Sequence, residues 1–182
     1  MRTLLLLALL LAACGPATNQ PKGSAQANAT AVVSPVEQLQ RADFAGYHVA
    51  PYTGPKRAPD FSGAHRALRV YRSLLGDAVS TGPNFAGRYA LAQIGCGASC
   101  TTVYLIDVST GGIEPLLFGG ELSPYALDLG FQRDSALLRT HWQVIDRQAN
   151  PLRCEYENFV LHEGHLVSLG RAEAGGECPL PE

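Results

Sequence analysis

Two cysteines four positions apart, Cys96 and Cys100, are the first candidates for chemistry in this sequence. Redox pairs of the thioredoxin type are separated by two residues and open a helix, whose N-terminus activates the thiol. Here three residues separate the cysteines, and the following Thr-Thr-Val-Tyr-Leu-Ile is typical of a strand. The papain-like signature also differs, because it places Cys-Gly-Ser/Ala-Cys directly before an aromatic residue. The spacing therefore favours a disulfide across a turn.

Serine and metal chemistry lack a complete motif. Ser99 has no second glycine after it, as the Gly-x-Ser-x-Gly nucleophile elbow requires. His162 and His165 flank a predicted hairpin turn, whereas the zinc motif His-Glu-x-x-His places its histidines one helical turn apart. The sequence predicts no catalytic residue, no metal site and no cofactor.

Several polar residues remain as candidates for binding. Asp107 ends a strand-like run before Ser109-Thr110-Gly111-Gly112, so it either accepts backbone N–H groups of that turn, the favoured interpretation, or belongs to a site. Arg88 and Tyr89 are either site residues or a surface charge beside a packed aromatic ring. The candidates for binding are Asn84, Arg88, Tyr89, Asp107 and His141. An enzyme would instead bring Arg88, Asp107, Asp128 and His141 into one pocket.

The N-terminus predicts export and lipid attachment. Residues 1–13 carry one positive charge before an apolar run that is too short to span a membrane. Leu11-Ala12-Ala13-Cys14 resembles the lipobox of bacterial lipoproteins, which implies acylation of Cys14; an ordinary cleaved signal peptide is the alternative. By the sorting rule of Gram-negative lipoproteins, Gly15 rather than aspartate after the cysteine favours the outer membrane, facing the periplasm.

The rest of the chain divides into a tether and one domain. Residues 14–35 are rich in small and polar residues and predict a flexible tether, whereas residues 36–182 have the length of a single domain. The formal charge of −2 and the scattered basic residues argue against a nucleic-acid partner. The expected partners are the membrane, through the lipid on Cys14, and a protein in the periplasm.

Four cysteines besides Cys14 predict two disulfides, because the periplasm is oxidising. Sequence alone allows three connectivities. We favour Cys96–Cys100, which closes a tight glycine-containing loop, together with Cys154–Cys178, which ties the C-terminal tail back to the domain.

The elements that must position these residues predict an α+β fold. Residues 62–83 show the 3.6-residue apolar period of an amphipathic helix, with Ser62 as N-cap. Its apolar positions are Ala64, Ala67, Leu68, Tyr71, Leu74, Leu75 and Ala78. Strands are expected at 88–94, 102–108, 113–118, 125–131, 136–145, 155–162 and 166–171. Short connections predict a largely antiparallel β-meander of six or seven strands with one covering helix.

The segment from Pro83 to Cys100 resembles one found in a group of bacterial exported proteins. These proteins share Pro-Asn-Phe-Ala-Gly-x-Tyr, then a strand, then Gly-Cys-Gly-x-x-Cys; they often carry His where this chain has Arg88 and Trp where it has Ile94. The resemblance implies an exported protein and no particular activity.

The sequence favours a non-enzymatic lipoprotein that binds an envelope component or a protein. An inhibitor or immunity protein of a cell-wall hydrolase is one concrete form, by analogy of architecture. Such an inhibitor needs an exposed loop, for which Gly119-Gly120-Glu121 is the candidate. The alternatives are a hydrolase that acts on envelope material and a purely structural envelope protein.

Overall fold

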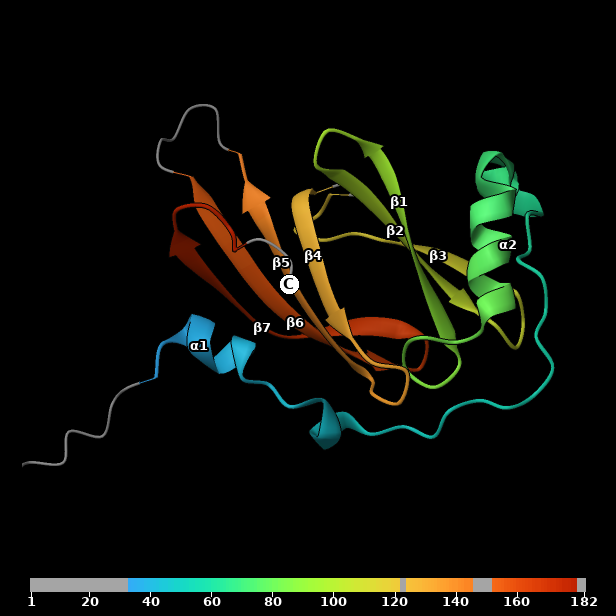
Figure 1. Ribbon diagram of the computed structural model, residues 1–182, viewed down its shortest axis with the longest axis horizontal. Coiled ribbons are helices and arrows are strands. Elements are labelled where there is room, and N and C mark those ends of the chain that lie inside the picture. Colours follow the sequence, from blue (N-terminus) through green and yellow to red (C-terminus); the bar gives the residue numbers. More distant parts are fainter. Residues whose placement is uncertain (1–32, 122–123, 146–151, 180–182) are drawn as a thin grey trace, which may run out of the picture. The chain divides into compact units, whose positions relative to one another are not determined.

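Seven antiparallel strands form one sheet in the order β1-β2-β4-β5-β6-β7, and β3 adds to β2 (Figure 1). The computed structural model describes residues 33–121, 124–145 and 152–179. The strands are β1 Tyr89–Gly97, β2 Cys100–Asp107, β3 Ile113–Leu116, β4 Tyr125–Phe131, β5 Leu137–Val144, β6 Arg153–His162 and β7 His165–Gly175. The largely antiparallel sheet is thereby confirmed. The predicted signal peptide, Cys14 and nearly all of the tether lie outside the described residues.

The sheet departs from a simple meander at β2. Residues 103–106 of β2 pair with β3, while Cys100 at the start of β2 pairs with Tyr125 of β4. Strands β3 and β4 thus share one edge of β2, and β4 continues through β5, β6 and β7 by consecutive antiparallel pairing. The sheet therefore has two halves, β1–β3 and β4–β7, that are joined by few hydrogen bonds.

Alternating side chains of β1 and β2 feed two apolar cores. Leu91 and Leu105 belong to a core that also contains Leu138, Trp142 and Phe159 of the other half. Residues of the opposite parity, which include Ala90, Ala92, Ile94, Tyr104 and Ile106, pack in a second core with Leu75 and Val79. Because both faces are covered, the sequence of these strands is almost continuously apolar. Trp142 is a core residue.

The predicted helix at 62–83 is only half α-helical. Residues Gly63–Tyr71 form a 3-10 helix, and α2 covers Arg72–Thr81. The 3-10 turn has three residues instead of 3.6, so the single apolar face expected from the sequence does not persist. Leu75 and Val79 are buried, while Leu74 faces solvent. Ser62 makes no side-chain capping bond; its hydroxyl instead donates to Asp60.

A short helix, α1 (Pro35–Gln40), is capped by Ser34 and precedes a coil of residues 41–61. Asn158 of β6 donates to the Leu39 carbonyl at 2.8 Å, and Arg139 of β5 donates to the Gln40 carbonyl at 2.8 Å. These bonds hold the end of α1 on the sheet. The coil contains a 3-10 turn at Phe44–Tyr47 and a single bridge between His48 and Ser135.

The two disulfides join Cys96 to Cys100 and Cys154 to Cys178, as favoured from the sequence. The first closes the tip of the β1–β2 hairpin, and the second fastens the C-terminal tail to β6. In the part of the chain that the structure describes, no helix is long and apolar enough to cross a membrane.

Candidate functional site

Asn84 has a structural role at the edge of the sheet. Its amide oxygen accepts from the Leu91 N–H at 2.7 Å, and its amide nitrogen donates to the Leu91 carbonyl at 3.1 Å. The backbone of Asn84 and Phe85 also bonds to Tyr89. These contacts occupy the outer edge of β1 at Tyr89 and Leu91, so the side chain of Asn84 is engaged with the backbone.

Arg88, Tyr89 and Asp107 form a second cluster. The Arg88 Nε lies 3.2 Å from Asp107 Oδ2, and Arg88 Nη2 donates to the Tyr89 hydroxyl at 3.0 Å. That hydrogen bond, supported by the charge of Asp107, raises the pKa of Arg88. Asp107 Oδ1 accepts from the Ser109 N–H at 2.8 Å. Asp107 is therefore the turn cap that its sequence context favoured, and it also forms an ion pair.

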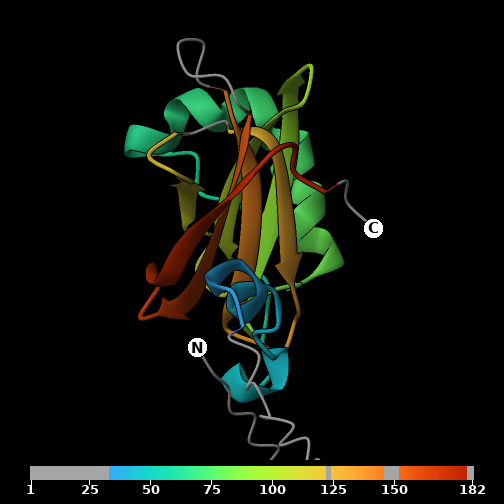
Figure 2. The ribbon, with the colours of Figure 1, turned by 90° about the vertical axis from the view of Figure 1, so that its left-hand side faces the viewer.

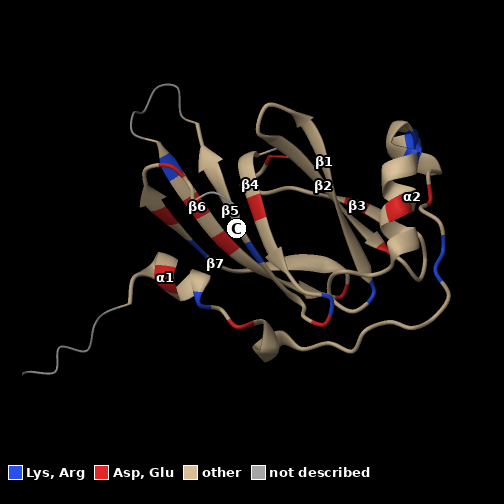
Figure 3. Ribbon diagram, viewed as in Figure 1, with Lys and Arg blue, Asp and Glu red and all other residues tan. Residues whose placement is uncertain are grey.

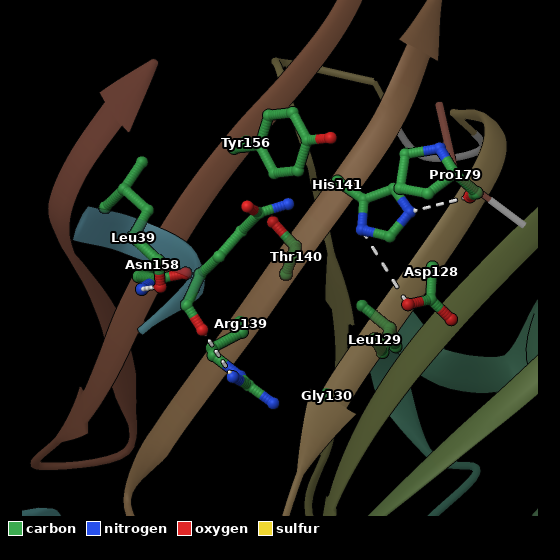
Figure 4. A pocket seen from close by; sticks show the side chains of 11 residues that line it. Leu39, Asp128, Leu129, Gly130, Arg139, Thr140, His141, Tyr156, Asn158 and Pro179 are labelled. Atoms are coloured by element: carbon green, nitrogen blue, oxygen red, sulfur yellow. Dashed lines mark hydrogen bonds and ion pairs between the residues drawn. The ribbon is translucent and has the colours of Figure 1, made fainter. Parts of the chain in front are cut away.

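His141 lies in a groove of about 450 Å³ on the outer face of β4–β6 (Figure 4). Its Nδ1 is 3.7 Å from Asp128 Oδ2, and its Nε2 is 3.2 Å from the Pro179 carbonyl. Tyr156 packs beside the imidazole with ring centroids 5.4 Å apart. Burial raises the pKa of the Tyr156 hydroxyl. His141 thus connects β4 to the C-terminal tail across the sheet face.

The groove is bounded by two segments that the sheet holds in place. Leu39 and Gln40 of α1 line one end, and Pro179 of the tail lines the other. Gln143 fixes the tail further, because its amide oxygen accepts from the Cys178 N–H at 2.8 Å. The polar side chains of this face therefore act mainly as attachment points for chain segments.

The four residues of the enzyme hypothesis do not converge. Arg88 pairs with Asp107 across β1 and β2, while Asp128 pairs with His141 across β4 and β5, and the two pairs line different pockets. Among the described residues, no group of three or more His, Cys, Asp or Glu is arranged to hold a metal ion. The structure therefore offers isolated ion pairs in place of one polar centre.

An exposed apolar surface, which the sequence analysis did not identify, lies at the end of the sheet that carries the β1–β2 tip. Tyr125, Ile145 and Leu152 are 41%, 51% and 41% exposed, and we call these three residues the apolar ridge. They line a cleft of about 560 Å³ that also contacts Ser99 and Cys178. Alternation places such residues at strand ends but does not show which of them the other described residues leave exposed, so the sequence carried no signal for the ridge.

A polar recess adjoins the ridge on its other side. Tyr125 and Ile145 also line this recess, together with Glu155 and Arg171. Arg171 forms an ion pair with Glu155 and lies over the Trp142 ring, 5.4 Å from its centroid. The Gly119-Gly120-Glu121 turn at its rim is exposed, as an inhibitory loop would require.

A Cβ at Gly119 would lie 2.9 Å from a Trp142 ring carbon, and the residue has φ +61°, so the turn needs glycine at this position.

Comparison of the chain with protein-family models, curated proteins and solved structures gives no match.

Proposed function

We propose that this chain is a non-enzymatic binding module, anchored to the outer membrane through a lipid on Cys14, that recognises a protein in the periplasm. The apolar ridge of Tyr125, Ile145 and Leu152 is the contact surface. The observation that carries the proposal is the gathering of three half-exposed large apolar side chains around one cleft.

The chemistry of this surface matches that of protein interfaces. Such interfaces have an apolar centre, often with an aromatic anchor, and a polar rim. Tyr125 supplies the aromatic ring, and Ile145 and Leu152 extend the apolar area. Ser99 and Glu177 on the cleft side supply polar groups for the rim.

The ridge is also braced against movement. Cys96–Cys100 closes the hairpin on one side of the cleft, and Cys154–Cys178 fixes the tail on the other. A rigid surface loses less conformational entropy on binding, so its contacts yield more affinity. Figures 1 and 2 show the β1–β2 tip at the end of the sheet opposite α1. The ridge therefore lies at the far end of the sheet from α1.

An inhibitor or immunity protein of a cell-wall hydrolase is the concrete form of this proposal. The exposed Gly119-Gly120-Glu121 turn lies beside Tyr125 in the recess and offers the Glu121 carboxylate to a partner. Glycosidase clefts contain a protonated acid and polar donors that a carboxylate can contact. In this form the ridge supplies affinity and the turn blocks the cleft.

The Asp128–His141 pair supports a hydrolase as the second candidate, because a histidine oriented by a carboxylate can act as a general base. However, Nε2 of His141 contacts the Pro179 carbonyl, so the nitrogen that would accept a proton is already engaged. We therefore favour binding over catalysis. A hydrolase would lose its activity in a His141→Gln variant that still folds.

Site-specific photo-cross-linking tests the proposed contact surface. A photoreactive amino acid replaces Ile145 in the full chain, in the cells that produce it, and a matched variant carries it at Val70, which is 76% exposed on the 3-10 helix before α2. The expected result is one discrete protein adduct from position 145 and none from position 70. Tyr125→Asp should remove the adduct. Equal labelling from both positions, or no adduct at all, would contradict the proposal.

A further inference from the structure

The two outer edges of the sheet are treated differently. Asn84 and the Phe85 backbone bond to the edge of β1, whereas the sheet ends at β7 and no other described strand pairs with it. Edge strands are usually protected by lysine, proline or a covering segment. β7 spans eleven residues and leaves Val167 and Leu169 48% and 43% exposed. A bulge interrupts its pairing with β6 at residue 169, and α1 contacts it. Residues 170–175 lie beyond the bulge and contain neither lysine nor proline, so this part of the edge is a template for another strand.

We infer that β7 pairs antiparallel with β7 of a second copy of this chain, about a two-fold axis at Ala172. In this register Arg171 of each copy lies directly opposite Glu173 of the other, which gives two attractive cross-strand pairs. Opposite charges in directly opposed positions stabilise a strand pair, and like charges destabilise it. Ala172 faces its own counterpart, and Gly170 faces Ala174, so no bulky side chains meet on the outer face.

The charges also select this register over its neighbours. Centring the two-fold axis on Arg171 opposes two arginines, and centring it on Glu173 opposes two glutamates. A two-fold axis placed between two residues would put inward-facing side chains opposite outward-facing ones, which the alternation of side chains along a strand does not allow. Among the closely spaced registers, only the axis at Ala172 makes both charge pairs attractive.

The same pairing extends a charge pattern already present on β6 and β7 (Figure 3). Within one chain Arg171 pairs with Glu155, and Arg153 Nη1 lies 3.1 Å from Glu173. Both pairs are diagonal, because Glu173 lies directly opposite Glu155 and Arg171 lies directly opposite Glu157. A second β7 adds a glutamate directly opposite Arg171 and an arginine directly opposite Glu173, so that each of these two charges gains a further partner of opposite sign. β7 forms the outer edge in Figure 1, on the side that faces the viewer in Figure 2.

Position-specific cysteine cross-linking tests the register. In an Ala172→Cys variant of the full chain, the two new thiols face each other across the axis, within the 4.4–6.8 Å Cα separation that disulfides span. Ser168→Cys is the matched control, because the two copies of residue 168 would be eight residues apart, roughly 27 Å. With copper-phenanthroline as oxidant, we expect a covalent dimer from Ala172→Cys and little from the more exposed Ser168→Cys.

Charge reversal provides an independent test. Arg171→Glu alone and Glu173→Arg alone each create two like-charge pairs, and each should weaken dimerisation at least roughly tenfold in sedimentation velocity of the detergent-solubilised full chain. Mixing the two single variants restores opposite charges in both pairs, so a heterodimer should recover. Thermal melting of each variant distinguishes lost pairing from misfolding.

A wild-type chain that remains monomeric at about 100 µM would overturn the inference, because a specific dimer should form at that concentration. Covalent dimers that form equally from residues 168 and 172, or Ala172→Cys adducts with a different protein, would also overturn it. Because Ala172 and Ser168 line neither the apolar ridge nor the adjoining recess, the two cysteine variants leave the proposed protein partner and its cross-link at position 145 unaffected.

Discussion

The half-sheet β1–β3 and the half-sheet β4–β7 share one sheet but differ in how they are covered. The first has α2 on one face, the common core on the other and Asn84 on its free edge. The second presents a groove on its outer face, the apolar ridge at one end and, at β7, an edge with which no other described strand pairs. We therefore expect β1–β3, the closed half, to supply stability and β4–β7, the open half, to supply surfaces for partners.

The largest effect should follow from opening the shared core. Phe85 is fully buried and packs edge-on against Phe131, with ring centroids 6.3 Å apart. Phe85→Ala should lower the free energy of unfolding by about 3–5 kcal/mol, because it removes apolar contacts and leaves a cavity. Urea denaturation measures the loss. Val167→Ala on the open edge is the control and should change the stability of the monomer little; equal losses would contradict the division.

The two disulfides should differ in their contribution. Chain-entropy arguments assign about 3.5 kcal/mol to a loop of the size closed by Cys154–Cys178, and about 2 kcal/mol to the loop closed by Cys96–Cys100. Replacing both members of each pair with alanine isolates the two contributions. Denaturant midpoints at constant m-value measure the difference, and a larger loss from the hairpin pair would reverse the expected order.

Asn84→Ala should remove the side chain that bonds to the outer edge of β1. The N–H and the carbonyl of Leu91 both lose their partner, which should cost about 1–3 kcal/mol of folding stability. Asn84→Asp keeps the acceptor for the N–H and loses the donor to the carbonyl, so an intermediate cost is expected. If neither variant changes the unfolding midpoint, water satisfies this edge and the side chain is not a structural cap.

The smallest effect concerns alkaline pH. Burial raises the pKa of Tyr104 in the closed half and of Tyr156 in the groove. Between their unfolded and folded pKa values the folded state retains protons that the unfolded state has lost. The associated stability is therefore complete below the unfolded pKa of about 10 and is lost as the pH rises through the folded values. Tyr104→Phe and Tyr156→Phe should each reduce this loss of stability with rising pH. Chemical denaturation from about pH 9 to about pH 12, on either side of the unfolded pKa of about 10, measures the effect. An unchanged slope would show that the tyrosines do not cause it.

Local features of the sequence determined much of this fold. Tyr125–Phe131 is found as expected, and the other six strands differ from expectation mainly at their ends. Glu163-Gly164 forms the turn between β6 and β7, and Asp107 caps its own turn. Both disulfides join cysteines as favoured. These features depend on alternation, turn chemistry and loop closure, which act over a few residues or along one loop.

Tertiary packing decided the rest. Whether Leu74 or Leu75 faces the sheet depends on the phase at which the 3-10 helix gives way to α2. The separation of Arg88 and Asp107 from Asp128 and His141 depends on how β3 and β4 share the edge of β2.

The exposure of the apolar ridge depends on segments distant in the chain, whereas Asn84 bonds to the edge of β1 from only seven residues away. Sequence periodicity specifies the direction in which a side chain points relative to its own strand. It does not specify which other segment, if any, covers that side chain, because that depends on long-range contacts.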